Sequence, residues 1–132
     1  DAERALRDGI GRAPTDAALY ASLGLLLVEE KREAAAVAAL TKSAQIEPER
    51  ARTLYNLGLL QQRRGDLRAA GTTLAKAHAL GDADATYALA LLELKQNRPD
   101  RALPLVEALV AANPGNAQLA QMRDDVRRAV RP

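Results

Sequence analysis

A short apolar pattern recurs along the chain at nearly constant spacing. The segment Tyr20-Ala-Ser-Leu-Gly24 aligns with Leu54-Tyr-Asn-Leu-Gly58, and Tyr55-Asn-Leu-Gly-Leu-Leu60 aligns with Tyr87-Ala-Leu-Ala-Leu-Leu92 at a slightly shorter spacing. A unit of this size cannot bury its own apolar surface, so successive units must stack on one another. The spacing therefore predicts an array of repeats.

Composition favours helices and removes most kinds of catalytic site. Of the 132 residues, 48% are hydrophobic but only 2% are aromatic, so Ala and Leu, both strong helix formers, must fill the interior. The sequence has no Cys and a single His, which rules out disulfides and Cys-based sites and disfavours a Ser/His pair or a His-rich metal site. No Gly-rich phosphate loop is present. We expect no catalytic residues, no cofactor and no metal, and therefore no enzyme.

Small and large apolar residues occupy fixed places in each unit, counted from Ala17, Ala51 and Ala83. The eighth place holds Gly24, Gly58 and Ala90, and the twentieth holds Ala36, Ala70 and Ala102. The seventh place holds Leu23, Leu57 and Leu89, and the twenty-fourth holds Leu40, Leu74 and Val106. The small side chains at the eighth and twentieth places let the two helices of a unit approach closely. The pattern resembles the tetratricopeptide repeat, a helix–turn–helix unit of roughly 34 residues. The resemblance implies an all-α solenoid of helical hairpins stacked in a right-handed superhelix.

The same register divides the whole chain. We expect the second helix of a truncated repeat at 1–16, repeats at 17–50, 51–82 and 83–116, and a capping helix at 117–132. The final segment has one apolar stripe among polar residues, as a capping helix needs. The chain is therefore expected to be a piece of a longer array.

Turn residues predict where the helices of each unit begin and end. Gly65 and Asn97 tolerate a left-handed backbone between the two helices, whereas Lys31 departs from this pattern at the same place. Pro99 suits the first turn of a helix. Pro104, a full turn further on, predicts either a kink or a helix that begins nearer to Pro104.

The resemblance also implies where a ligand would bind. In such repeats the first helix lines a concave face, and its second, fifth, sixth, ninth, twelfth and thirteenth places commonly face the ligand. The candidate partner-binding residues are Leu25, Val28, Arg52, Tyr55, Asn56, Leu59, Gln62, Arg63, Tyr87, Leu91, Leu94 and Lys95. This set predicts an apolar groove with Tyr anchors for an amphipathic helix or an extended peptide. Its basic members would steer acidic flanks of the ligand. In the alternative interpretation, neighbouring first helices bury these apolar side chains against one another.

The function expected from these features is a non-catalytic protein-interaction scaffold with a protein or peptide partner. Self-association through an exposed apolar face of the N-terminal helix is one alternative, giving a homo-oligomer. An accessory domain that positions a larger enzyme or a secretion complex is another. Nineteen basic and seventeen acidic residues are interleaved, which disfavours nucleic acid. No apolar run is long enough to span a membrane. We expect a soluble cytoplasmic or periplasmic protein, and the Ala- and Arg-rich usage favours a bacterial source.

Overall fold

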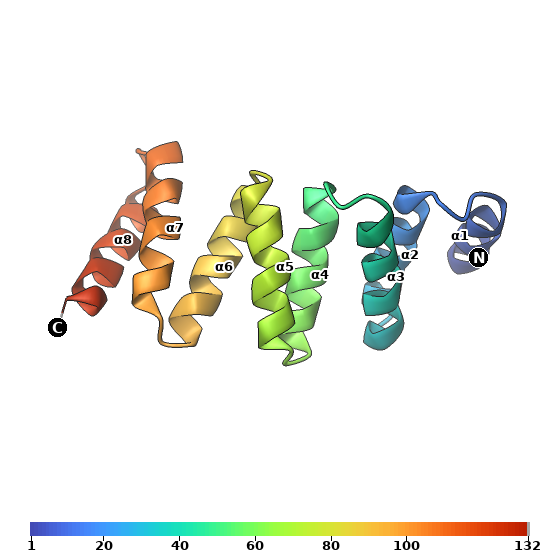
Figure 1. The fold of residues 1–132 in the computed structure, drawn as a ribbon, viewed down its shortest axis with the longest axis horizontal. Coiled ribbons are helices and arrows are strands. Elements are labelled where there is room, and N and C mark those ends of the chain that lie inside the picture. The colour runs from blue at the N-terminus through green and yellow to red at the C-terminus, as the bar shows by residue number, and fades with distance from the viewer. Residues whose placement is uncertain (132) are drawn as a thin grey trace.

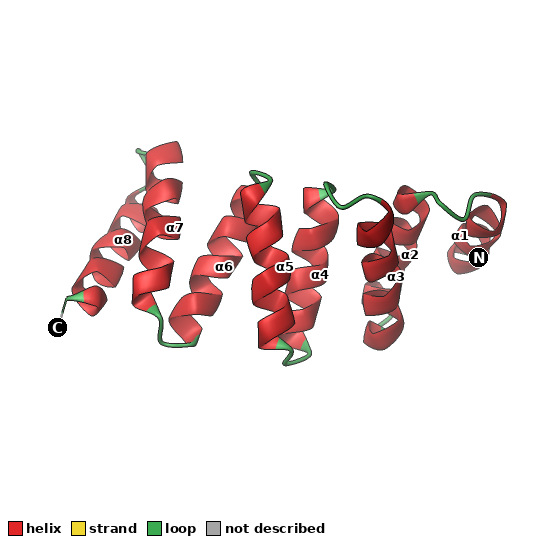
Figure 2. Cartoon of the chain, viewed as in Figure 1, coloured by secondary structure: helices red, strands yellow, loops and turns green. Residues whose placement is uncertain are grey.

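The computed structural model describes residues 1–131, which fold into eight helices without a strand (Figure 2). The helices are α1 (Ala2–Arg12), α2 (Ala17–Glu29), α3 (Glu33–Ile46), α4 (Ala51–Arg63), α5 (Leu67–Ala79), α6 (Ala83–Lys95), α7 (Pro99–Ala112) and α8 (Ala117–Val130). Pro132, the last residue of the expected segment 117–132, lies outside the described residues.

The helices pack in chain order along an elongated body, with the two termini at opposite ends (Figure 1). The closest pairs are α2 with α3, α4 with α5, and α6 with α7, and each pair then packs on the next. The expected all-α solenoid is thus confirmed. The division into repeat units at 17–50, 51–82 and 83–116 stays a prediction.

Close approach within each pair depends on the small residue at the eighth place. A Cβ atom added at Gly24 would lie 2.6 Å from Cγ of Leu40, and one added at Gly58 would lie 2.6 Å from Cγ of Leu74. Both leucines are fully buried. In the third pair, Ala90 and Val106 belong to one buried cluster. Ala90 is larger than the glycines of the first two pairs, and Val106 is smaller than their leucines. The pairs therefore keep a similar total side-chain volume, as close-packed interiors require.

The turns between the two helices of each pair contain a residue with a left-handed backbone conformation, as the sequence predicts for Gly65 and Asn97. Gly65 and Asn97 have φ angles of 86° and 60° in the turns that follow α4 and α6. Lys31 adopts the same conformation after α2, with φ 60°, although its Cβ makes this conformation costly. Lys31 therefore differs from Gly65 and Asn97 in residue type but has the same backbone conformation.

Relieving this strain is expected to stabilise the chain. Lys31→Gly should raise the free energy of unfolding by roughly 0.5–1 kcal/mol, since glycine adopts positive φ without a steric cost. Lys42→Gly, at an exposed site inside α3, is the control and should lose about 1 kcal/mol of helix propensity. Urea unfolding measures both. Equal losses in the two variants would contradict the left-handed turn.

The start of α7 differs from one expectation. The helix begins at Pro99 and continues through Pro104 to Ala112, so the predicted start near Pro104 is wrong. The missing amide of Pro104 leaves the carbonyl of Asp100 without its helical partner. Both residues are exposed, and water can hydrogen-bond that carbonyl.

The self-association alternative requires an exposed apolar face on the N-terminal helix α1, and the structure covers part of that face. Its apolar residues Leu6 and Ile10 are half-buried against the cluster formed by α2, α3 and α4. Among the described residues, the exposed large apolar side chains all lie outside α1. The expected exposed apolar face on this helix is therefore wrong, because the only other apolar residues of α1 are Ala and Gly.

Candidate functional site

Three leucines recur at the ninth place of successive first helices. Leu25 on α2, Leu59 on α4 and Leu91 on α6 are 43%, 37% and 42% exposed. A single exposed leucine needs no explanation. Here the same place is apolar in every repeat and more than a third of each side chain is exposed, so neighbouring helices cover these three leucines only in part. The first helices α2, α4, α6 and α8 define what we call the inner face.

The inner face deepens into a groove of about 950 Å³ at its C-terminal end, between α6 and α8. The C-terminal groove has apolar walls and a polar rim. Its large apolar residues are Tyr87, Leu91 and Leu94 from α6, Leu109 from α7, and Leu119, Met122 and Val126 from α8. Tyr87 lines the groove and is 43% exposed. Of the sequence-predicted residues, Tyr87, Leu91 and Leu94 are brought together here.

Sequence reasoning missed the contribution of α8 to this groove, because it treated that helix as a cap alone. The signal was available in the repeat register. Counted from Ala117, the second, fifth, sixth, ninth and thirteenth places all line the groove, and they hold Gln118, Gln121, Met122, Asp125 and Ala129. The helix α8 thus presents to the groove the places that the first helix of a repeat would present.

Arg52 joins α4 to the start of α6 across the inner face. Its Nη1 lies 2.9 Å from Oδ2 of Asp82 and 2.9 Å from Oδ2 of Asp84, and its guanidinium stacks 4.4 Å from the ring centre of Tyr55. Asp82 is buried and also caps α6 by accepting from the amide of Ala85 at 3.0 Å. Hydrogen bonds to Asp82 and then to Asp84 raise the pKa of Arg52 above its ordinary value.

The predicted steering charges are therefore not all available to a ligand. Arg52 is held by two aspartates, and Nε of Arg63 lies 2.6 Å from Oε2 of Glu33 on α3. Lys95, at the end of α6, is exposed and makes no ion pair within residues 1–131. Electrostatic steering by Arg52 and Arg63 is weakened because intramolecular carboxylates compensate both charges.

The other predicted residues are more buried than a ligand-facing role requires. Val28 is half-buried against the cluster of α2, α3 and α4, and Tyr55 packs against the cluster of α4, α5 and α6. Asn56 and Gln62 are also half-buried. Tyr55 therefore has a packing role in addition to its contact with Arg52, whereas Tyr87 is exposed.

Metal-ligating geometry is not found in the described part of the chain, where no three His, Asp or Glu side chains gather closely enough. The single His78 has a structural contact, with its Nδ1 2.6 Å from Oγ1 of Thr86 across α5 and α6. No helix within residues 1–131 has the length and apolarity needed to cross a membrane.

Comparisons with known proteins agree with this architecture. A family model for the tetratricopeptide repeat matches residues 17–50. No curated protein matches the sequence. Among solved structures, YrrB, a tetratricopeptide repeat protein with an unusual peptide-binding site, is similar with a TM-score of 0.75 and 23% identity, over 87% of this chain and 60% of that one.

Two further solved structures have the same fold. MamA from Desulfovibrio magneticus RS-1, starting at its residue 41, has a TM-score of 0.75 and 26% identity, over 87% of this chain and 66% of that one. PilF from Pseudomonas aeruginosa has a TM-score of 0.77 and 21% identity, over 96% of this chain and 59% of that one. The chain spans less than two thirds of the length of each of these three structures.

Proposed function

We propose that this chain, a tetratricopeptide repeat protein, is a non-catalytic scaffold that binds a partner protein through a peptide or amphipathic helix lying along the inner face. Proteins built from this repeat are generally protein-interaction scaffolds, and YrrB has a peptide-binding site. The repeat family thus supports a role in protein binding, and the exposed side chains of this chain support the inner face as the binding surface.

The observation that carries the proposal is the row of exposed leucines that ends in the C-terminal groove. Leu25, Leu59 and Leu91 repeat at one place, and the row meets Tyr87 and Met122 at its deep end. At the deep end, Tyr87, Leu91, Leu94 and Met122 line one groove, and apolar surface gathered in this way marks interaction sites in soluble proteins. An amphipathic helix would place its apolar face on this row and leave its polar face in water.

The polar rim of the groove sets the orientation of such a ligand. Asn113, Asn116 and Gln118 border the groove and offer both donors and acceptors to a peptide backbone or to polar side chains. Asp125 adds a carboxylate on α8, though Arg128 and Gln121 already bond to it. The groove therefore combines an apolar contact area with polar groups at its edge, as ligand sites commonly do.

One leucine pair gives a matched test of the surface. We expect helical peptides selected from a display library against the wild-type chain to bind Leu91→Ser at least about fivefold more weakly, because losing an apolar contact at the centre of an interface, where the binding energy is concentrated, costs about 1 kcal/mol or more. Leu80→Ser is the control, because Leu80 is 44% exposed but lies at the end of α5, away from the groove. Fluorescence anisotropy measures the affinities.

The melting temperature of each variant separates binding from folding. Leu91 and Leu80 are exposed to the same degree, so both serine variants should melt close to the wild type. Selected peptides that bind Leu91→Ser as tightly as Leu80→Ser would contradict the proposed surface. A library that yields no binding peptide would contradict it as well.

A further inference from the structure

Two buried side-chain oxygens in residues 1–131 have no hydrogen-bond partner, and they lie at the same place in successive repeats. They are Oε1 of Gln61 on α4 and Oε2 of Glu93 on α6, each at the eleventh place of its unit. In the first unit this place holds Leu27, which is fully buried. The packing at this place therefore accepts an apolar side chain, and a buried carboxylate without a partner is costly.

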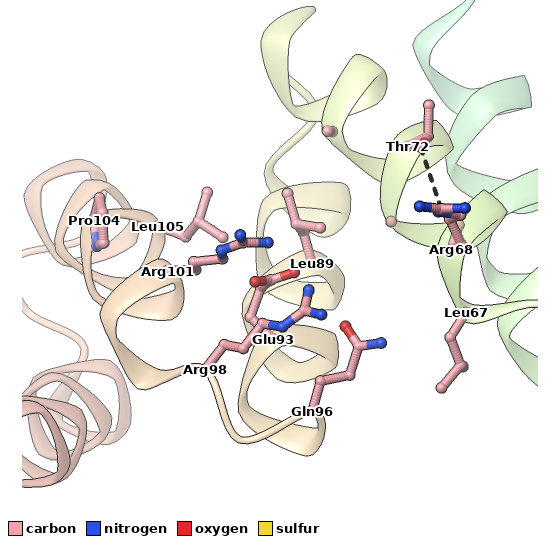
Figure 3. Close-up of a pocket in the computed structure, with 12 residues that line it drawn as sticks. Leu67, Arg68, Thr72, Leu89, Glu93, Gln96, Arg98, Arg101, Pro104 and Leu105 are labelled. Atoms are coloured by element: carbon pink, nitrogen blue, oxygen red, sulfur yellow. Dashed lines mark hydrogen bonds between the residues drawn. The ribbon is translucent and has the colours of Figure 1, made fainter.

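Glu93 lines a second cleft, and the inner-face residues Tyr87, Leu91 and Leu94 do not line it. This outer cleft has a volume of about 650 Å³ and is bounded by α5, α6 and α7 (Figure 3). Glu93 is only 8% exposed. The corresponding space beside Gln61 is smaller, about 270 Å³, and contains a neutral amide in place of the carboxylate. The enlarged cleft and the buried charge thus occur together in the third repeat.

Three arginines line the same cleft. Arg98 and Arg101 stand beside Glu93 at the start of α7, and Arg68 reaches the cleft from the α5 wall (Figure 3). All three are exposed, and none pairs with a carboxylate within 4.0 Å in the described part of the chain. The lining of the cleft therefore includes three cationic groups and one carboxylate. Such a field attracts an anionic ligand, while the buried oxygen of Glu93 demands a hydrogen-bond donor.

We infer that the outer cleft is a second binding site, which takes an acidic peptide segment carrying one lysine or arginine. The acidic side chains pair with the arginines, whose guanidinium groups bind carboxylates in two-point contacts. The basic side chain of the peptide enters between Leu89 and Leu105, which line the cleft, and its charged end pairs with Glu93.

The geometry of Glu93 allows this pairing with little rearrangement. The terminal torsion of a glutamate is broad, so the carboxylate can turn either oxygen toward the cleft. A peptide cation placed there supplies the donor that the protein itself does not provide. The outer cleft shares no lining residue with the C-terminal groove. This inference is accordingly independent of the function proposed for the inner face.

The test uses two fluorescent peptides that differ at one side chain. The first is acetyl-Glu-Asp-Lys-Asp-Glu-amide, and in the second norleucine replaces lysine. We expect the wild-type chain to bind the lysine peptide about tenfold more tightly than the norleucine peptide, and to bind it more weakly as salt is added. Glu93→Gln keeps the size of the side chain and should bind both peptides equally.

The arginines are tested in the same assay. The double variant Arg98→Ala/Arg101→Ala should weaken binding of both peptides by about tenfold or more. Arg12→Ala is the control, since it removes one exposed arginine from α1, far along the chain from the cleft. Absence of saturable binding by the wild type at millimolar peptide would overturn the inference. Retention of the lysine preference by Glu93→Gln would overturn it too.

Discussion

Gly58→Leu is expected to lower the free energy of unfolding by about 3 kcal/mol or more, because a new side chain would enter a fully packed helix contact. The first added atom alone would lie 2.6 Å from Cγ of Leu74, whose side chain is completely buried and has nowhere to move. Gly11→Leu is the matched control, since Gly11 is also helical but a Cβ there meets nothing within 4 Å. Urea unfolding followed by circular dichroism measures the difference.

A milder pair of substitutions tests the same contact without unfolding the chain. Gly58→Ala and Leu74→Val together reproduce the combination that the third repeat has in Ala90 and Val106. Each single variant should lose stability, one through crowding and the other through a lost methylene group. The double variant should be more stable than the sum predicts, by about 1 kcal/mol. If the two stability changes simply add in the double variant, the side chains at 58 and 74 do not interact.

Glu93→Leu is expected to raise the free energy of unfolding by about 2 kcal/mol, because it removes an unpartnered buried carboxylate oxygen and its desolvation cost. The first repeat already holds Leu27 at this place, fully buried. The substitution should also raise the melting temperature by several degrees, which differential scanning calorimetry measures. Such a gain would show that the unpartnered buried oxygen of Glu93 lowers the stability of the wild-type chain.

Gln61→Leu provides the comparison for this prediction. Gln61 has the same place on α4 and also has one unpartnered buried oxygen, but its amide is uncharged. The gain at Gln61 should therefore be smaller than the gain at Glu93. A loss of stability in Glu93→Leu would show that Arg98 or Arg101 pairs with the carboxylate in solution, contrary to the structure.

Much of the fold could be predicted from the sequence, because the repeat register fixes which residues face each other. The small residues at Gly24 and Gly58 mark the helix contacts directly, since a Cβ atom there would lie 2.6 Å from a buried leucine. The conformation of Lys31 could not be read from its residue type, which disfavours positive φ. The start of α7 was also ambiguous in the sequence, since both Pro99 and Pro104 fit a helix start when considered alone.

The candidate surface could be predicted only in part. The apolar members Leu25, Leu59 and Leu91 follow from the register and are exposed. The pairing of Arg52 with Asp82 and Asp84 joins α4 to the start of α6. Such contacts between residues far apart in the sequence require the three-dimensional packing.

Glu93 escaped sequence reasoning for a different reason. At the eleventh place of a helix, a glutamate is expected to face solvent, and charged side chains are rarely buried without a partner. Only the positions of α5 and α7 show that it is covered. The one signal in the sequence was the comparison with Leu27, which shows that this place can belong to the interior.

The location of a bound peptide on the chain tests the central claim most directly. With a selected peptide, methyl NMR spectra should show the largest chemical-shift changes at Leu59, Leu91 and Met122, on the inner face and in the C-terminal groove. The methyl groups of Leu80, which is equally exposed but distant from the groove, should not shift. Changes at Leu80 or at Leu105 of the outer cleft, with an unchanged spectrum for Leu91, would contradict binding on the inner face.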